Sequence, residues 1–362
     1  MSHEPAVPGP DAPRPLPELP ALPGVSYVMP VLNEQESLRD AVHTVLAQDY
    51  AGEQELVLAL GPSTDGTDAI AAELAAADPR IILVPNPERD IPIGLNLAIA
   101  ASRYPVVVRV DAHSELTPDY TAVAVAALHR PGVANVGGVM RARGKTPWQR
   151  AIARGYNSPF GLGGGTYHGD GVAGPAESAY LGVFRRSAID EVGGFDPEIR
   201  RGEDWELNLR IRRAGHTVWF EPALGVTYWP RQSLGQLSRQ FFATGVWRAV
   251  LVRRYGGANP WRFFVPGALV LALASSLGIG AMQLSGLLSG PLAIWANGIH
   301  LAPLGYLAGV ALGVSRMPEQ HGVGDRLRSV AVLVTMHLSW GSGFLVGLVK
   351  GGGDSVDRSR MT

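Results

Sequence analysis

The stretch VVVRVDAHSEL, residues 106–116, decides the fold. Its first residues are β-branched and apolar apart from Arg109, which is typical of a strand buried in a parallel sheet. The apolar run ends abruptly, and Asp111 and His113 follow it. Because residues i and i+2 of an extended segment point to the same side, the sequence places a carboxylate and an imidazole together at a strand end.

Strand-like and helix-like segments alternate around this stretch. Apolar runs predict strands at residues 25–31, 55–60, 81–85 and 105–110. Periodically apolar runs predict helices at residues 34–48, 68–77 and 93–102. This order favours an α/β fold, with a Rossmann-like and mostly parallel sheet covered by helices on both faces. Ligands bind such sheets beyond the carboxyl ends of the strands, where the polar segments PVLNE, GPSTDGT and DAH stand.

The composition excludes several classes of protein. The 362 residues carry a formal net charge of -1, which gives no electrostatic reason to expect a nucleic-acid partner. The chain has no cysteine, so disulfides and thiolate chemistry are excluded. Any metal ion must therefore be held by oxygen atoms and imidazole nitrogens.

The C-terminal third is unusually apolar. No Asp, Glu, Lys or Arg occurs from Phe263 to Ser315, which is long enough for two membrane-spanning helices. A third candidate covers Val330–Leu348, and an apolar core of a soluble domain is the alternative for the whole region. Arginines stand before the first span and between the second and third, so the positive-inside rule predicts a multi-pass protein of the cell membrane with the α/β domain in the cytoplasm.

These observations predict a simple domain order. The N-terminus holds eight prolines in its first 24 residues, which indicates a disordered tail. The aromatic and arginine-rich segment before the first span indicates an amphipathic helix at the membrane surface. The expected domains are a tail at 1–24, an α/β domain at 25–235, an interfacial segment at 236–262, two or three membrane helices at 263–349, and a tail at 350–362.

Taken alone, each polar motif has a plain structural interpretation. Asp111 and His113 could hold a divalent cation, with Mn²⁺ suited somewhat better than Mg²⁺, or could simply end a turn. The segment GPSTDGTD, residues 61–68, could line a nucleotide pocket or cap a helix. The segment RRGEDWELNLRIRRAGH, residues 200–216, predicts a helix with acids first and arginines last. Within it, Asp204 could accept a proton in a cleft or belong to an ordinary surface helix.

The ordered set of motifs resembles the family 2 glycosyltransferases of the GT-A fold. The segments PVLNE, STDGT, GLNLAIAAS, VDAH, GGFD and GEDWELNLRIRRAG follow the running order of that family across about residues 25–235. Within the family, the sequence is most similar to the exopolysaccharide group of the succinoglycan biosynthesis protein ExoA. That group also has D-A-H in place of D-x-D, an F-R-R segment before G-G-F-D, and C-terminal membrane helices.

The resemblance implies a role for particular residues. Asp204 would be the general base, with Glu203 as its partner in the E-D pair. Asp111 and His113 would bind the divalent cation, Mn²⁺ or Mg²⁺. The residues implied in binding the nucleotide-sugar are Pro30, Asn33, Glu34, Ser63, Asp65, Gly94, Asn96 and Asp111.

Two features concern specificity. Many relatives carry two acids before the S-T-D-G-T loop, the first of which reads uracil, but this sequence has Leu60 and Gly61 there, which leaves the base of the nucleotide open. The glycine-rich segment 157–178 is interpreted as a mobile acceptor loop or an ordinary solvated loop. His168 and Glu177 on it, with Trp205 next to the expected base, are the candidate acceptor-binding residues.

The resulting prediction is a membrane-bound, inverting hexosyltransferase. It would move a sugar from a nucleotide-sugar donor to a polyprenyl-linked saccharide in exopolysaccharide or cell-envelope synthesis, in contact with membrane lipid. A bare polyprenyl phosphate is the alternative acceptor. A catalytically silent membrane scaffold with a degenerate transferase domain is the alternative from another class.

Overall fold

The computed structural model describes residues 15–162 and 171–353. These residues form two compact units. The sheet unit comprises the described residues within Met1–Arg141 and Gly165–Trp229, and the helical unit comprises those within Ala142–Gly164 and Pro230–Arg360. The chain thus enters the helical unit twice, first with the segment Ala142–Gly164 and finally at Pro230, near the predicted boundary at 235. The composition of the first segment did not indicate that it belongs to a different unit.

Four parallel strands form the half of the sheet that carries the polar motifs. They are β1 (Val25–Val31), β2 (Gln54–Leu60), β3 (Ile81–Pro85) and β4 (Val106–Arg109). Strand β1 lies between β2 and β4, and β3 pairs with the outer side of β2. Their carboxyl ends therefore meet at one edge, as the sequence predicts.

The strands beyond β4 pair in the antiparallel direction. They are β5 (Ser114–Leu116), β6 (Val133–Ala142), β7 (Gly174–Pro175), β8 (Tyr180–Arg185) and β9 (Thr217–Tyr228). Among the described residues the sheet has the order β3-β2-β1-β4-β8-β6-β9-β5, with β7 paired to β9. Strand β8 runs antiparallel to β4 and brings the FRR segment beside that strand, with Phe184 paired to Val107 and Arg185 to Val106.

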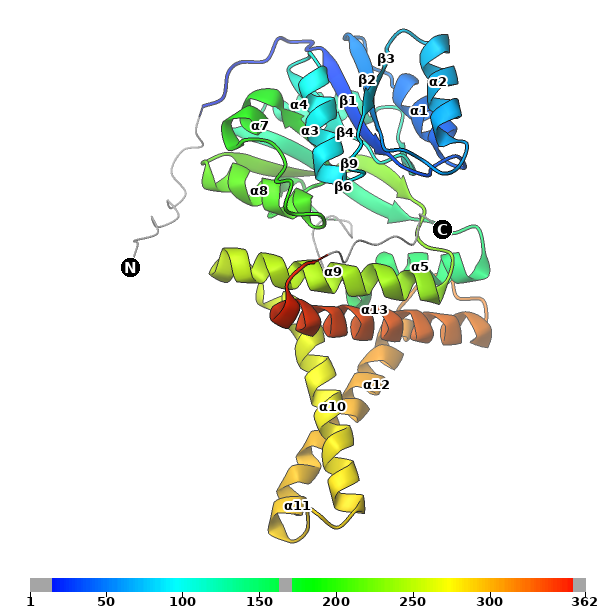
Figure 1. The fold of residues 1–362 in the computed structure, drawn as a ribbon, viewed down its shortest axis with the longest axis vertical. Coiled ribbons are helices and arrows are strands. Elements are labelled where there is room, and N and C mark those ends of the chain that lie inside the picture. Colours follow the sequence, from blue (N-terminus) through cyan, green and yellow to red (C-terminus); the bar gives the residue numbers. More distant parts are fainter. Residues whose placement is uncertain (1–14, 163–170, 354–362) are drawn as a thin grey trace. The chain divides into compact units, whose positions relative to one another are not determined.

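Helices cover both faces of the sheet, which confirms the expected α/β architecture (Figure 1). One face packs against α1 (Leu38–Leu46), α2 (Thr67–Ala77) and α4 (Tyr120–Leu128). The other face packs against α3 (Ile91–Ala101), α7 (Arg186–Val192) and α8 (Glu203–Arg213). Alternate residues of β1 supply the two cores, because a strand presents successive side chains to opposite faces.

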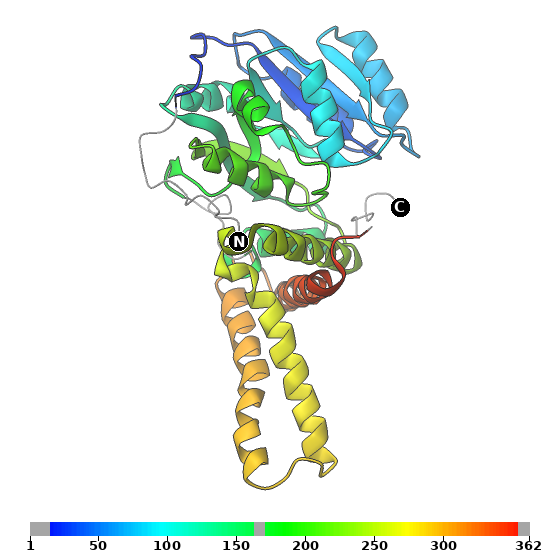
Figure 2. The same cartoon turned by 60° about the vertical axis from the view of Figure 1, so that its left-hand side comes forward.

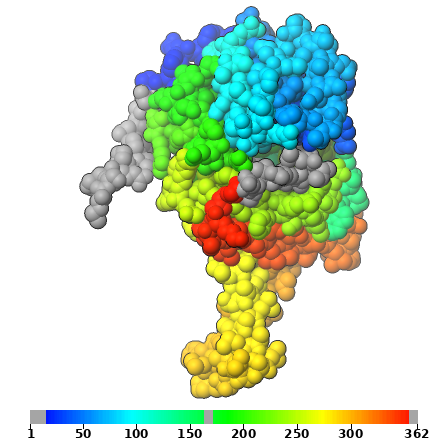
Figure 3. Space-filling model, in the orientation of Figure 1, coloured from blue at the N-terminus to red at the C-terminus, as the bar shows by residue number. Residues whose placement is uncertain are grey.

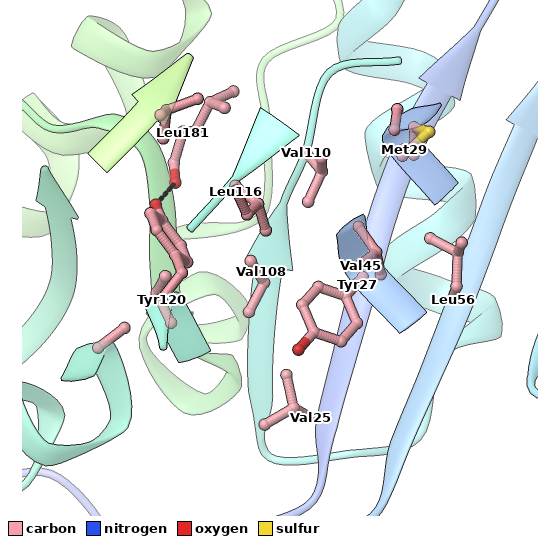
Figure 4. Packing of buried hydrophobic residues seen from close by; sticks show 14 of the residues in the cluster. Val25, Tyr27, Met29, Val45, Leu56, Val108, Val110, Leu116, Tyr120 and Leu181 are labelled. Carbon is pink, nitrogen blue, oxygen red and sulfur yellow. Dashed lines mark hydrogen bonds between the residues drawn. The ribbon is translucent and has the colours of Figure 1, made fainter. Parts of the chain in front are cut away.

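The first core also contains tyrosines whose hydroxyl groups are satisfied. Tyr27 points into it beside Val108, and the Tyr120 hydroxyl donates to the Leu181 carbonyl oxygen at 3.1 Å (Figure 4). The Tyr27 hydroxyl is 2.6 Å from the Thr121 hydroxyl. These bonds remove the cost of burying the phenol groups and fix α4 against the sheet.

The helical unit contains long apolar helices. Its described helices are α5 (Pro147–Tyr156), α6 (Pro159–Leu162), α9 (Leu234–Tyr255), α10 (Val265–Leu284), α11 (Pro291–Ala296), α12 (Leu301–Ser315) and α13 (Val323–Lys350). Three helical segments are long and apolar enough to cross a membrane: Trp261–Leu284, Pro291–Ser315 and Val323–Lys350. Within this unit α10 and α12 form a hairpin (Figure 2).

Candidate active site

Hydrogen bonds join the loops that follow β1 and β2. The backbone N–H of Asn33 donates to the Ser63 hydroxyl at 3.2 Å, and the N–H of Thr64 donates to the Asn33 side-chain oxygen at 2.7 Å. Asn33 has a φ of 54°, a left-handed conformation that asparagine tolerates well. The two loops predicted to bind the nucleotide are thus one connected structure.

The same loops also position Asp65 and Glu34. Asp65 accepts hydrogen bonds from the N–H and the hydroxyl of Thr67 at 3.0 and 2.5 Å. The Thr67 hydroxyl oxygen in turn accepts from the backbone N–H of Glu34 at 2.8 Å. Pro30, beside Ala59 of β2, lies just before this loop at the end of β1. The side chain of Asp65 therefore shapes the loop pair and holds Glu34 in place.

Helix α3 contributes two more of the predicted nucleotide-binding residues. A Cβ at Gly94 would lie 2.6 Å from the side-chain nitrogen of Asn86, so a larger residue would displace the Asn86 side chain. The Asn96 amide donates to the Phe195 carbonyl oxygen at 2.7 Å and accepts from the Phe195 N–H at 2.9 Å. Asn96 thus fastens the GGFD turn to α3, and its role toward a nucleotide stays a prediction.

Asp111 and His113 lie at the carboxyl end of β4, next to Glu34. The closest nitrogen and oxygen of His113 and Asp111, Nε2 and Oδ2, are 4.0 Å apart. The other ring nitrogen of His113, Nδ1, lies 3.0 Å from the Glu34 carboxylate, which also accepts from the Ser37 hydroxyl at 2.7 Å. An imidazole whose Nδ1 is bound by a carboxylate presents Nε2 as a ligand. Glu34 is therefore placed to orient His113, a contact that the sequence could not show.

Arg109 connects the two predicted catalytic regions. Its side chain is only 5% exposed, and one guanidinium nitrogen lies 2.9 Å from the Glu203 carboxylate and 3.3 Å from that of Asp111. The other terminal nitrogen donates to Asp204. Asp111 at the end of β4 and the acidic pair at the start of α8 thus share one guanidinium, although more than 90 residues separate them.

Sequence reasoning noted Arg109 only as an interruption of the strand. A single arginine in a run of valines is nevertheless a signal, because a buried charge needs partners of the opposite sign. Three carboxylates around one guanidinium leave an excess of negative charge. An arrangement of this kind favours binding of a further cation or retention of a proton.

The electrostatics of this cluster act on Asp204. Burial, together with the negative charges of Glu203 and Asp111, outweighs the attraction of Arg109 and raises the pKa of Asp204 to about 7. Burial alone would lower the pKa of Arg109, but the three carboxylates hold it well above the usual value. About a fifth of the Asp204 side chain remains exposed (22%), so a reacting group can reach it. A carboxylate with these properties can accept a proton near neutral pH.

Two of the three predicted acceptor-binding residues lie together. The indole N–H of Trp205 donates to the Glu177 carboxylate at 2.9 Å. Trp205 directly follows Asp204 on α8, and Ser178 accepts from Asn208 of the same helix at 3.1 Å. The segment around Glu177 is thereby tied to the helix that carries the candidate base. His168 lies outside the described residues.

Comparison with known proteins identifies the family of the chain. A family model described as Glycosyl transferase family 2 matches residues 26–193. The succinoglycan biosynthesis protein ExoA of Rhizobium meliloti is 31% identical over 322 residues, 88% of this chain and 92% of that protein. A dolichyl N-acetyl-alpha-D-glucosaminyl phosphate diacetamido-dideoxy-glucuronosyltransferase of Methanococcus voltae is 23% identical over 69% of this chain and 80% of its own.

A solved structure shows the same fold. The mannosyltransferase PcManGT from Pyrobaculum calidifontis superposes with a TM-score of 0.62 at 20% identity, covering 94% of this chain and 91% of its own. The similarity to ExoA spans nearly the whole of both chains and includes the region that the family model matches. The chain therefore belongs to glycosyl transferase family 2.

Proposed function

We propose that the protein is a membrane-bound inverting glycosyltransferase that moves a hexose from a nucleotide-sugar donor to a polyprenyl-linked saccharide in polysaccharide synthesis. The observation that carries the proposal is the bridge that Arg109 makes between Asp111 and the pair Glu203 and Asp204. The bridge brings Asp111, which is suited to the donor diphosphate, close to Asp204, which is suited to proton removal. A single displacement at a sugar carbon requires both groups in one place.

The donor would bind at the edge formed by the carboxyl ends of β1, β2 and β4. The loops around Asn33 and Ser63, which hydrogen bonds connect, would hold the nucleoside, and the loop after β4 would supply Asp111 to the ribose or diphosphate. Leu60 and Gly61 at the end of β2 offer no side-chain acid to a base, so the donor need not carry uracil.

A divalent cation, Mn²⁺ or Mg²⁺, fits the residues at this edge. Among the described residues no group of three or more His, Asp or Glu side chains could hold a metal ion. The protein would contribute two ligands, Asp111 and His113, and the donor phosphates would provide others, as is usual for such cations. The excess negative charge around Arg109 and the Mn²⁺ and GDP-Man bound in PcManGT support this proposal. When bound, the cation would neutralise charge on the leaving diphosphate.

The chemical step needs a base on the acceptor. The Asp204 carboxylate would take the proton from the acceptor hydroxyl as that oxygen bonds to the anomeric carbon and the bond from this carbon to the diphosphate breaks. Arg109 would hold the carboxylate in position, and Glu203 would share that guanidinium. One displacement inverts the anomeric centre, so an α-linked donor would give a β-linked product.

The acceptor and the membrane orientation follow from the apolar helices. A lipid-linked saccharide is the substrate class that a membrane anchor would concentrate, and the relatives include a protein named for a dolichyl-phosphate-linked sugar and another for succinoglycan biosynthesis. Arginines stand before the first apolar helix and between the second and third along the chain, so the positive-inside rule supports a cytoplasmic catalytic domain.

Product analysis tests the proposal. Purified protein would be incubated with UDP-, GDP- and dTDP-sugars, with Mn²⁺, and with either a polyprenyl-diphosphate saccharide or a polyprenyl phosphate. We expect one donor to extend the saccharide with inversion, as read by mass spectrometry and NMR. A product formed only on polyprenyl phosphate would overturn the acceptor class. Retention of configuration would overturn the mechanism, and no transfer from any donor would favour a silent scaffold.

Replacing His113 should weaken metal binding. In His113→Ala we expect the affinity for Mn²⁺ in the presence of nucleoside diphosphate to fall by more than about tenfold, measured by calorimetry or electron paramagnetic resonance. Glu34→Ala should weaken it by about tenfold, because Nδ1 of His113 loses the carboxylate at 3.0 Å. His43→Ala, an exposed histidine on α1, is the control. Unchanged Mn²⁺ affinity in His113→Ala, or full activity in EDTA, would exclude this metal site.

The activity should depend on pH through Asp204. A pKa of about 7 means that Asp204 is increasingly protonated below neutrality and cannot then accept a proton. We expect kcat/KM to fall by about tenfold per pH unit below about pH 7 and to level off above it. The measurement is initial rate against pH at low acceptor concentration. A flat profile between pH 5 and 8 would show that no group of this pKa is required.

A further inference from the structure

Helix α13 is apolar enough to cross a membrane. Its contacts with α10, however, are confined to the N-terminal end of α10. A Cβ at Gly341 would lie 2.1 Å from the Pro266 carbonyl oxygen, and the rings of Phe264 and Phe344 are 5.6 Å apart. The remainder of α10 reaches to Leu284, which is 93% exposed. Helices that cross a bilayer side by side would touch along most of their length, so α13 crosses the base of the hairpin (Figures 1 and 2).

The partner that α13 follows along its length is α9. The two helices pack so closely that glycines of α13 touch the backbone of α9, and a Cβ at Gly343 would lie 2.1 Å from the Phe242 carbonyl oxygen. Side chains on both helices also meet, with the hydroxyl groups of Ser238 and Ser339 2.9 Å apart. Successive contacts, four residues apart on each helix, pair Ser238 with Ser339, Phe242 with Gly343, and Val246 with Gly347.

The first turns of α13 are tied to α5 instead. The Arg154 guanidinium donates to the Ser329 hydroxyl at 3.3 Å and lies 3.7 Å from the Asp325 carboxylate. Gly155 of α5 allows Val332 and Met336 to approach. Both partners of α13 thus bring arginines beside it.

The charges on α9 restrict where α9 and α13 can lie relative to the bilayer. Helix α9 carries Arg239, Arg248, Arg253 and Arg254, and is not among the three segments apolar enough to span. If α13 crossed the bilayer, α9 would accompany it and carry these arginines into the hydrocarbon, at about 2.5 to 3.5 kcal/mol for each at the centre. In the plane of the interface none of these arginines has to enter the hydrocarbon, and the exposed Arg239, Arg253 and Arg254 can reach the headgroups.

The exposed surface of the helical unit supports the same arrangement. In the most apolar stretches of Trp261–Leu284 and Pro291–Ser315 only 17% is buried inside the protein, whereas in that of α13 39% is buried. Figure 3 shows α10 uncovered by other described segments on the face in view. Trp261, 79% exposed, stands three residues before Phe264, whose ring lies 5.6 Å from that of Phe344 of α13, and an aromatic side chain there would mark the membrane–water interface.

We propose that α13 and α9 lie side by side in the plane of the cytoplasmic membrane surface, bound to lipid headgroups, and that α10 and α11–α12 are the two crossings. Both ends of α13 then lie on the same side of the membrane. The basic residues Arg326, Arg328 and Lys350 at these ends lie on the cytoplasmic side, in accord with the positive-inside rule. The proposal concerns membrane topology and does not depend on the catalytic assignment.

The cysteine-free chain allows a direct test with single cysteines. Val323→Cys and Val349→Cys mark the two ends of α13, where the native side chains are 74% and 83% exposed. Ser289→Cys marks the exposed connection between α10 and α11, and Ala72→Cys on α2 marks the α/β domain. Each variant would be treated with a membrane-impermeant maleimide in intact bacterial spheroplasts, again after permeabilisation, and again after denaturation to confirm that the thiol is present.

We expect Ser289→Cys to react in intact spheroplasts and the other three cysteines to react only after permeabilisation. Reaction of Val349→Cys but not Val323→Cys in intact spheroplasts would show that α13 crosses, and would overturn the proposal. Reaction of Val323→Cys, Val349→Cys and Ala72→Cys in intact spheroplasts, with Ser289→Cys protected, would retain the in-plane helix and overturn only the cytoplasmic orientation. A phosphatase that is active only outside the cytoplasm, fused after residue 362, gives a second measurement. We expect it to be inactive, because both ends of α13 would lie on the cytoplasmic side.

Discussion

Asp204→Asn should lower kcat by at least ~10²-fold and leave the affinity for the donor nucleotide within about twofold. Asparagine has nearly the same shape, and its side-chain oxygen can still accept the hydrogen bond from Arg109. Its amide cannot take a proton from an acceptor hydroxyl. The measurements are steady-state kinetics with saturating acceptor and calorimetric titration of the nucleoside diphosphate.

Glu203→Gln is the matched comparison, because Glu203 binds the same guanidinium at 2.9 Å and precedes Asp204 on the same helix. We expect a smaller loss of kcat in this variant. A 10²-fold loss in Glu203→Gln with little loss in Asp204→Asn would transfer the role of base to Glu203. A parallel loss of donor affinity and turnover in Asp204→Asn would show that Asp204 supports the site structurally and does not perform the chemistry.

Much of the sheet could be predicted because its central strands β1, β2 and β4 are buried on both faces and are therefore mostly apolar. The predicted strands at 25–31 and 81–85 coincide with β1 and β3, since both are mostly apolar segments followed by turn-forming residues. The pattern cannot show pairing, so the antiparallel direction of β8 and β9 was not predicted. Such pairings depend on contacts between residues distant in the chain.

Helix boundaries were less predictable where a loop has a second purpose. The helix expected from residue 34 begins at Leu38. Asn33 adopts a left-handed conformation and Glu34 is held by Thr67 of the neighbouring loop, so the chain makes a turn before α1 can start. Residues 33 and 34 therefore connect the two loops and do not begin the helix.

The candidate site was predictable in its motifs but not in its connections. The sequence marked Asp111, His113 and Asp204 because carboxylates and imidazoles at strand and helix ends are suited to this chemistry. It could not show that Glu34 contacts His113, or that the Asn96 amide is engaged by Phe195. These contacts depend on the packing of β1 against β4 and of α3 against the GGFD turn, and no local pattern records them.

Arg109→Met should cost the most stability of any substitution considered. Methionine fills a similar volume but leaves Asp111, Glu203 and Asp204 without their shared cation, and removing one partner of a buried ion pair typically costs about 3 to 5 kcal/mol. We expect the free energy of unfolding of the detergent-purified protein to fall by this amount near pH 8. The loss should shrink toward pH 5, where the raised pKa of Asp204, about 7, leaves that group protonated and one repulsive charge is removed.

Two further variants separate charge from packing. Arg39→Met removes an arginine from an exposed pair with Glu73, in which the side chains are 49% and 65% exposed, so the free energy of unfolding should hardly change. Combining Arg109→Met with Glu203→Gln and Asp204→Asn removes two of the three negative charges and should restore most of the stability without restoring turnover. If the triple variant were as unstable as Arg109→Met, the loss would come from packing, and Arg109 would fill space between β4 and α8 without acting as the electrostatic link between the donor side and the base.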